Sequence, residues 1–147
     1  MRQLNNIQNI IFLLGAVLMV IGTGCVVFGI FIHSMSIVFC IGAISFALMQ
    51  MSQTYNGNNN TINRLRHLMV IGDICFIISG LLMIENVYHL IFPFMATTID
   101  GYNNYVKYIH NNWVVLLLIG AVFEIYTTNR ISHELKKEEE MKKNHNS

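Results

Sequence analysis

The stretch "IIFLLGAVLMVIGTGCVVFGIFI", residues 10–32, contains no charged residue and decides the class of protein. A helix needs about 20 mostly apolar residues to cross the hydrocarbon core of a membrane, and this stretch is long enough. It is longer than the apolar region of a secretory signal peptide, which has about 7–15 residues, and no small-residue cleavage site follows it. We therefore expect it to stay in the chain as a spanning helix.

The rest of the composition agrees with a membrane location. Of the 147 residues, 54% are hydrophobic and 12% are charged, against roughly 25% charged in soluble domains. No Lys, Arg, Asp or Glu lies between Arg2 and Arg64. The three cysteines fall in apolar runs and form no C-x-x-C pair, which indicates small buried side chains. We expect the lipid bilayer as partner, with no nucleic acid and no cofactor.

The apolar periodicity predicts an all-α integral membrane protein, an antiparallel bundle of four transmembrane helices. The expected spans are about residues 9–32, 37–53, 65–92 and 112–128, which together form a membrane domain over residues 1–129. "HSMS", residues 33–36, is expected as a tight turn, the Asn-rich segment 52–63 as a polar loop, and Pro93 as a helix stop. A charged helical tail follows over residues 130–147.

The positive charges predict the orientation. In a four-span arrangement nearly all Lys and Arg residues fall on the side of the termini, and only Lys107 falls on the other side. The positive-inside rule then places the N-terminus and the C-terminus in the cytoplasm. The outer connection, residues 93–111, carries an apolar and aromatic stripe with helical spacing, which predicts a short helix at the outer lipid interface. A lid over a ligand site is the alternative.

Small residues predict how the helices pack. In lipid the hydrophobic effect does not hold helices together, so close approach of their backbones through small side chains is needed. Gly15, Gly22 and Gly29 recur at intervals of seven on the first expected span. This stripe can face a neighbouring helix of the same chain or a second copy of the protein.

Two acids lie inside the expected spans. Asp73 lies about 10 Å along an ideal helix from Arg66, and Glu124 about 9 Å from Arg130, at 1.5 Å per residue. Because the two spans run in opposite directions, both carboxylates are expected at a similar depth. A charge inside a membrane is costly and is a functional candidate by default.

Three interpretations of these acids stay open. The first is structural: Asp73 and Glu124 form hydrogen bonds with polar neighbours and lock the bundle. The neighbours considered are Arg66, His67, Tyr126 and Arg130. In the second interpretation the acids share a proton or bind a cation, because two close carboxylates do not both ionise readily. In the third, one acid faces a charged residue of a partner membrane protein.

Four residues at the outer side are ligand candidates of another kind: His33, Glu85, His89 and His110. Glu85 and His89 are four residues apart on one helical face, and histidine with carboxylate ligands can hold a transition metal or, with two histidines, a haem. The spacing differs from the E-x-x-H of di-iron carboxylate proteins by one residue. Ordinary interfacial residues are the competing interpretation, and we assign no metal.

The segments "INRLRH" (62–67) and "FEIYTTNRISHELKKE" (123–138) resemble those of small four-span inner-membrane proteins of Bacteroidota-type bacteria. The resemblance implies a four-span fold in a bacterial cytoplasmic membrane and assigns no role to any residue. From the residues, we expect an accessory or interaction protein, with a homo-oligomer or a membrane-protein partner. The alternatives are a small oligomeric proton- or cation-coupled transporter using Asp73 and Glu124, and a metal- or haem-binding redox protein. No catalytic motif is present, so we do not expect an enzyme.

Overall fold

In the computed structural model, which describes residues 5–53 and 59–145, the chain is helical and these ranges contain no strand. The elements are α1 (Asn6–Val27), α2 (Ile32–Met51), α3 (Asn60–Tyr88), α4 (Phe92–Met95), α5 (Ile99–Tyr108) and α6 (Trp113–His145). Four segments are long and apolar enough to cross a membrane: α1, α2, α3, and the segment Ile99–Met141, which covers α5 and most of α6. The expectation of four apolar helices is confirmed.

Side chains just before the helices fix where three of them begin. Asn5 and Gln8 form a capping box at the start of α1, in which each side chain accepts a hydrogen bond from the other residue's backbone. Asn59 accepts a hydrogen bond from the backbone N–H of Thr61 at the start of α3. Thr98 does the same for α5 through the N–H of Gly101. Each cap satisfies an N–H group that the helix itself leaves unpaired.

The turn between α1 and α2 lies earlier than the sequence suggested. α1 ends at Val27, and the chain reverses through Gly29 and Phe31, which have positive φ angles of 75° and 46°. The predicted turn at residues 33–36 instead lies in the first turns of α2. Its polar Ser36 fits there because the hydroxyl donates to the carbonyl of His33, 3.0 Å away, within the helix. His33 therefore lies in the first turn of α2, which begins at Ile32.

The third helix is also displaced from the expected bounds. It begins at Asn60 and ends at Tyr88, ahead of Pro93. His89 takes a left-handed conformation with φ 53° and ends the helix. Pro93 lies in the first turn of α4, a position where its missing N–H costs nothing. Residues 54–58 of the expected polar loop lie outside the described residues.

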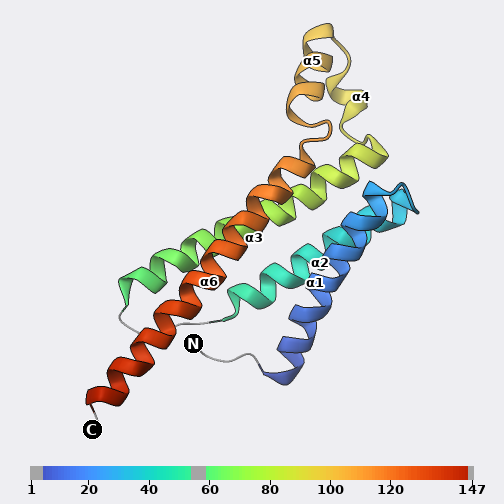
Figure 1. Cartoon of the computed structure of the whole chain (residues 1–147). Coiled ribbons are helices and arrows are strands. Elements are labelled where there is room, and N and C mark those ends of the chain that lie inside the picture. Colours follow the sequence, from blue (N-terminus) through green and yellow to red (C-terminus); the bar gives the residue numbers. More distant parts are fainter. Residues whose placement is uncertain (1–4, 54–58, 146–147) are drawn as a thin grey trace.

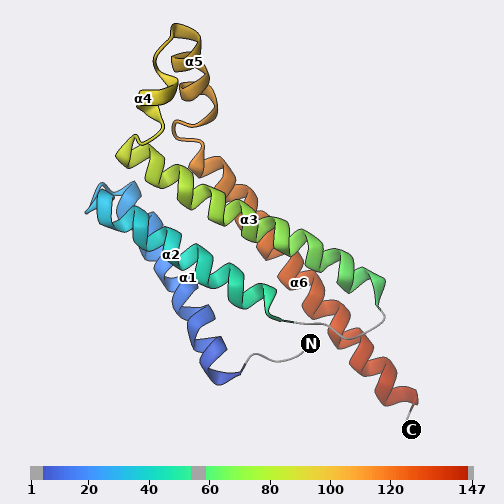
Figure 2. The same cartoon turned by 180° about the vertical axis from the view of Figure 1, so that it is seen from behind.

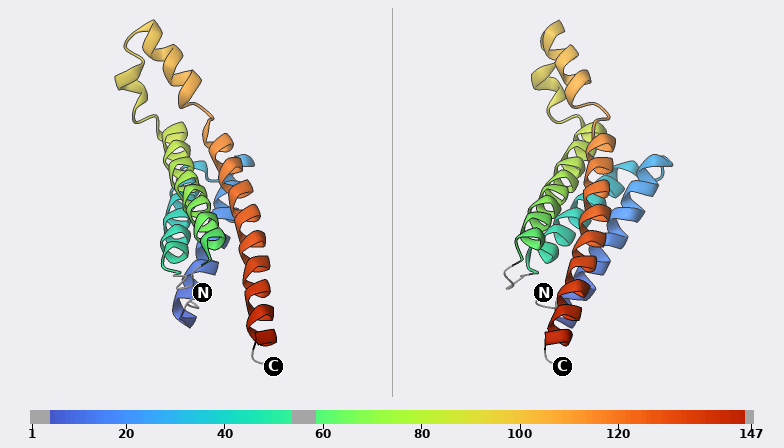
Figure 3. Two further views of the ribbon diagram at one scale, coloured as in Figure 1. Left: turned by 90° about the vertical axis from the view of Figure 1, so that its left-hand side faces the viewer. Right: turned by 60° about the vertical axis from the view of Figure 1, so that its left-hand side comes forward.

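Each long helix packs on the next in the order α1, α2, α3, α6 (Figures 1 and 2). Within the described ranges α1 and α6 do not pack on each other, so the side between them is open. α4 and α5 project beyond the ends of α3 and α6 (Figure 3). The expected tail is a continuation of α6, with no helix break at residues 129–130.

Glycines allow the closest helix contacts, as their spacing predicted. A Cβ on Gly15 would lie 2.9 Å from the backbone nitrogen of Phe46, and one on Gly22 would lie 2.8 Å from the Cβ of Phe39. Both contacts join α1 to α2. Gly72 of α3 packs on α6 in the same way, because a Cβ on Gly72 would lie 3.3 Å from the carbonyl oxygen of Gly120. Gly29, the third member of the predicted stripe, belongs to the turn.

The buried core lies between these helices. Its larger cluster joins all four long helices and consists of Met19, Phe39, Ala43, Phe76, Met83 and Trp113. A smaller cluster joins α3 to α6 through Leu65, Met69 and Ile131. The hydroxyl of Ser79 in α3 donates to the carbonyl of Trp113, 2.8 Å away, at the start of α6. This bond fixes the register of the two helices that carry the acids.

Candidate functional site

Asp73 is the least solvated acid of the described chain. It lies on the inner face of α3 with 0% of its surface exposed. Neither carboxylate oxygen has a hydrogen-bond partner. An ionised carboxylate buried without donors is very unfavourable, so such a group normally holds a proton or meets a cation. Among the described residues, Asp73 is therefore the acid whose burial and lack of hydrogen bonds most need a physical explanation.

Glu124 of α6 is half-buried and has defined partners. Its Oε1 accepts a hydrogen bond of 2.6 Å from the Nε2 of Gln50 in α2. Thr128, one turn further along α6, is a second hydrogen-bond partner. Gln50 is itself 3% exposed, and its carbonyl oxygen has no donor. The bond to Gln50 links α6 to α2, helices that do not otherwise pack on each other.

The two acids are close neighbours. Gly72, which precedes Asp73, lies against α6, and a Cβ at Gly72 would be 3.6 Å from Oε1 of Glu124. The two carboxylates interact electrostatically across the α3–α6 contact. The absent side chain of Gly72 gives Glu124 the space to approach α3 beside Asp73.

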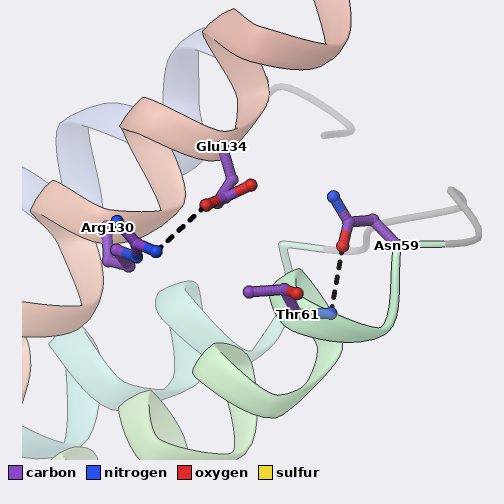
Figure 4. A network of polar contacts seen from close by, with 4 residues as sticks. All are labelled: Asn59, Thr61, Arg130 and Glu134. Atoms are coloured by element: carbon purple, nitrogen blue, oxygen red, sulfur yellow. Dashed lines mark hydrogen bonds and ion pairs between the residues drawn. The ribbon is translucent and has the colours of Figure 1, made fainter.

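The cations that could have neutralised the acids are bound elsewhere. The guanidinium of Arg66 donates to the backbone carbonyl of Gln53. Arg130 forms an ion pair with Glu134 on its own helix, with 3.4 Å between Nη2 and Oε1 (Figure 4). In the described part of the chain, no basic side chain pairs with Asp73 or Glu124. The structural interpretation, in which Arg66 or Arg130 locks the acids, finds no such contact.

Two hollows meet at Glu124. One, which we call the polar cavity, has a volume of about 350 Å³ and opens between the ends of the helices that lie nearer to the α6 tail. Its polar lining consists of Gln50, Gln53, Glu124, Thr128 and Ser132. The other, which we call the apolar groove, has a volume of about 550 Å³ and lies between α1 and α6. Phe46 and Glu124 line both and separate them.

The outer candidate Glu85 has a structural role. It is 4% exposed, and its carboxylate accepts hydrogen bonds from the backbone N–H groups of Ile91 and Phe92, at 2.9–3.2 Å. The hydroxyl of Tyr105 in α5 also donates to it, at 3.1 Å. Glu85 thus ties the end of α3 to α4 and α5. Three donors already occupy this carboxylate, which leaves it a poor metal ligand.

The three outer histidines are separated. The ring of His33 packs edge-on against Tyr88, with centroids 5.3 Å apart. Nδ1 of His89 lies 3.3 Å from the hydroxyl of Tyr105. His89 and His110, at the two ends of the segment 89–110, line a third cavity of about 400 Å³ with Phe92, Tyr102, Tyr105 and Val106. Within residues 5–53 and 59–145, no group of three His, Cys, Asp or Glu side chains is placed to hold a metal ion.

Gln50 is the site residue that sequence reasoning missed. It falls within the second expected span, residues 37–53, and was not singled out there. The signal was available, because an amide within an apolar segment must find a partner as an acid must. The identity of that partner was not available, since it depends on how α2 and α6 approach each other.

Comparison of the chain with models of protein families, with curated proteins and with solved structures gave no match.

Proposed function

We propose that the four long helices cross a membrane as an antiparallel bundle, with both termini on the cytoplasmic side of a bacterial inner membrane. The excess of Lys and Arg near the termini supports this orientation. The outward faces of the helices carry large exposed apolar side chains, such as Val20 at 73% and Val122 at 63% exposure. Such faces suit contact with lipid, and α4 and α5 then form an outer cap.

We infer that the protein is a small proton-linked carrier whose proton-binding groups are Asp73 and Glu124. One observation supports this most strongly: Asp73 is fully buried and its two oxygens have no donor. A proton on Asp73 removes the charge at no steric cost. Glu124, beside it and at the junction of the two hollows, gives the proton a route to the polar cavity.

A proton explains Asp73 better than the alternatives do. A basic side chain of a partner protein cannot reach a residue that is 0% exposed unless the helices separate. A metal cation such as Mg²⁺ or Ca²⁺ needs about six or more oxygen ligands. Among the described side chains, Glu124 is the one whose oxygens interact with Asp73, which is far fewer than six ligands. A proton needs a single oxygen.

The accessory protein is the second candidate. It is favoured by the open side between α1 and α6, where a helix of a membrane partner or of a second copy would fit. In that case Glu124, which is half-buried, would meet a Lys or Arg of the partner. The two candidates differ over Asp73, which a partner does not touch and a proton carrier requires.

Proton movement in liposomes tests the proposal. The purified protein is reconstituted into liposomes that enclose a pH-sensitive dye, and acidification of the outer solution drives protons inward. The measurement is made with liposomes that contain buffer alone. It is repeated with liposomes that contain a cell-free metabolite extract, which supplies solutes that the protein could exchange for protons. We expect acidification that is lost in Asp73→Asn and in Glu124→Gln.

The matched controls are acids outside the site. Asp100→Asn, in the first turn of α5, and Glu140→Gln, on the exposed tail of α6, are expected to retain the flux. Size-exclusion chromatography and circular dichroism check that each variant is folded. Flux that is equal in all variants, or that does not exceed empty liposomes under both conditions, would contradict a proton carrier.

A further inference from the structure

We propose that the polar cavity binds an organic ammonium ion with an apolar substituent, held by Glu124 and Gln50 and packed against Phe46. This inference rests on the proposed function and names the class of solute that the carrier exchanges for protons. The cavity is lined by residues of all four long helices. It is therefore a site that exists only when the whole membrane domain is folded.

The polar side of the cavity is rich in acceptors. Glu124 supplies a carboxylate, and Gln50 supplies a carbonyl oxygen that has no donor although the residue is 3% exposed. The backbone carbonyl of Gln53 is already bound by Arg66, which therefore points to the backbone and not to Glu124. Among the residues that the structure describes, no Lys, Arg or His lines the cavity. These acceptors favour a ligand that carries positive charge and N–H donors.

The opposite side of the cavity is apolar. Phe12 of α1 and Phe46 of α2 stack with ring centroids 4.6 Å apart and an angle of 23° between their planes. The rest of this side consists of Met69, Ile131 and Leu135. Such a wall stabilises an aliphatic or aromatic substituent and adds cation–π attraction for the ammonium group. An inorganic cation would gain nothing from it.

The size and position of the cavity fit a small solute. A volume of about 350 Å³ lies in the lower part of the range of about 300–1,000 Å³ for small-molecule sites. Phe46 separates the cavity from the apolar groove, so a turn of this ring would connect the two. The groove then offers the apolar substituent a way to the lipid side.

Binding exchanges a proton in a balanced way. A neutral carboxylic acid of the pair loses its proton to water, the carboxylate forms an ion pair with the incoming ammonium, and one proton is released per ligand bound. No bond to carbon forms or breaks, and no oxidant or reductant is needed. Because only one of the two neighbouring acids needs to be ionised, the bound state carries no excess charge.

Three probes of similar shape test the proposal on the wild-type protein in detergent micelles. They are 4-phenylbutylammonium, the neutral 4-phenylbutanol and the anionic 4-phenylbutyrate, and their binding is measured by isothermal titration calorimetry. A hydrogen bond to a charged group is worth about 1.5–3 kcal/mol, or roughly 10–150-fold in affinity. We expect the ammonium to bind at least tenfold more tightly than the alcohol, and the carboxylate not to bind.

Two variants locate the site. Glu124→Gln and Gln50→Leu are expected to reduce ammonium affinity about tenfold and severalfold, whereas Glu140→Gln leaves it unchanged. Equal binding of the ammonium and the alcohol, or no loss in Glu124→Gln, would overturn the proposal. Proton release is followed in weakly buffered solution. Ammonium binding without proton release would overturn the proton-linked function but support the ammonium site. Proton flux without ammonium binding would support the proton-linked function but overturn the ammonium site.

Discussion

The contact between α1 and α2 can be tested by replacing two glycines of α1, Gly22 and Gly24, and measuring the free energy of unfolding. In Gly22→Ala the new Cβ would lie 2.8 Å from the Cβ of Phe39 and 3.0 Å from its backbone nitrogen, so α1 and α2 must move apart. Overpacking of this kind costs about 1–3 kcal/mol. Alanine regains up to about 1 kcal/mol through its helix propensity. We expect a net loss of about 0–2 kcal/mol in the free energy of unfolding.

Gly24 provides the control on the same helix. A Cβ there meets no atom within 4 Å, so Gly24→Ala is expected to gain up to about 1 kcal/mol. The two variants should differ by about 1–3 kcal/mol. Unfolding in mixed micelles, titrated with sodium dodecyl sulfate and followed by circular dichroism, measures both. Equal stability of the two variants would refute the packing of α1 on α2 through Gly22.

Three further predictions concern other contacts and the orientation. Glu85→Gln removes the charge that holds the α4 amides and should lower the unfolding free energy by about 1.5–3 kcal/mol in the same titration; an effect no larger than that of Asp100→Asn would contradict this. Ser79→Ala removes the bond from α3 to α6 and should cost about 0.5–1.5 kcal/mol, more than Ser36→Ala, which loses only a bond within its own helix. With the three native cysteines replaced, a membrane-impermeant maleimide applied to intact bacterial cells with a permeabilised outer membrane should label Asp100→Cys but not Glu140→Cys; the opposite pattern would reverse the proposed orientation.

The helices of the fold could be predicted because their signal is local. Length and apolar composition set the four long segments, but the starts of α1 and α3 were expected too late, because their caps Asn5 and Asn59 were not recognised. The α1–α2 turn could not be placed from polarity alone. The polar residues 33–36 suggested a turn, but the chain reverses where Gly29 and Phe31 adopt positive φ angles. A glycine near the end of an apolar run was the better signal.

The candidate site was predictable in part for the same reason. Counting residues from Arg66 and Arg130 placed Asp73 and Glu124 at one depth, because helical rise is regular. The partners of the acids depend on which helix faces which, and that follows from glycine contacts between α3 and α6. Gln50 was therefore missed, and the arginines, which bond to Gln53 and Glu134, were wrongly considered as partners.

The role of Glu85 was hidden by backbone conformation. Its spacing from His89 on one helical face suggested a pair of metal ligands. The left-handed conformation of His89 ends α3 and turns the backbone N–H groups of Ile91 and Phe92 back onto the carboxylate. The spacing of Glu85 and His89 was interpreted as if the helix continued past His89, so the reversal of the chain at His89 could not be predicted from it.

Infrared spectroscopy of the purified protein at neutral pH tests the central claim most directly, because the C=O stretch of a protonated carboxylic acid is separate from that of a carboxylate. We expect such a band in the wild type, weaker in Asp73→Asn and unchanged in Asp100→Asn. Transfer to heavy water should shift it, since a transported proton must exchange with solvent through Glu124. A protein without this band, or with a band that does not shift, would contradict a proton carrier built on Asp73.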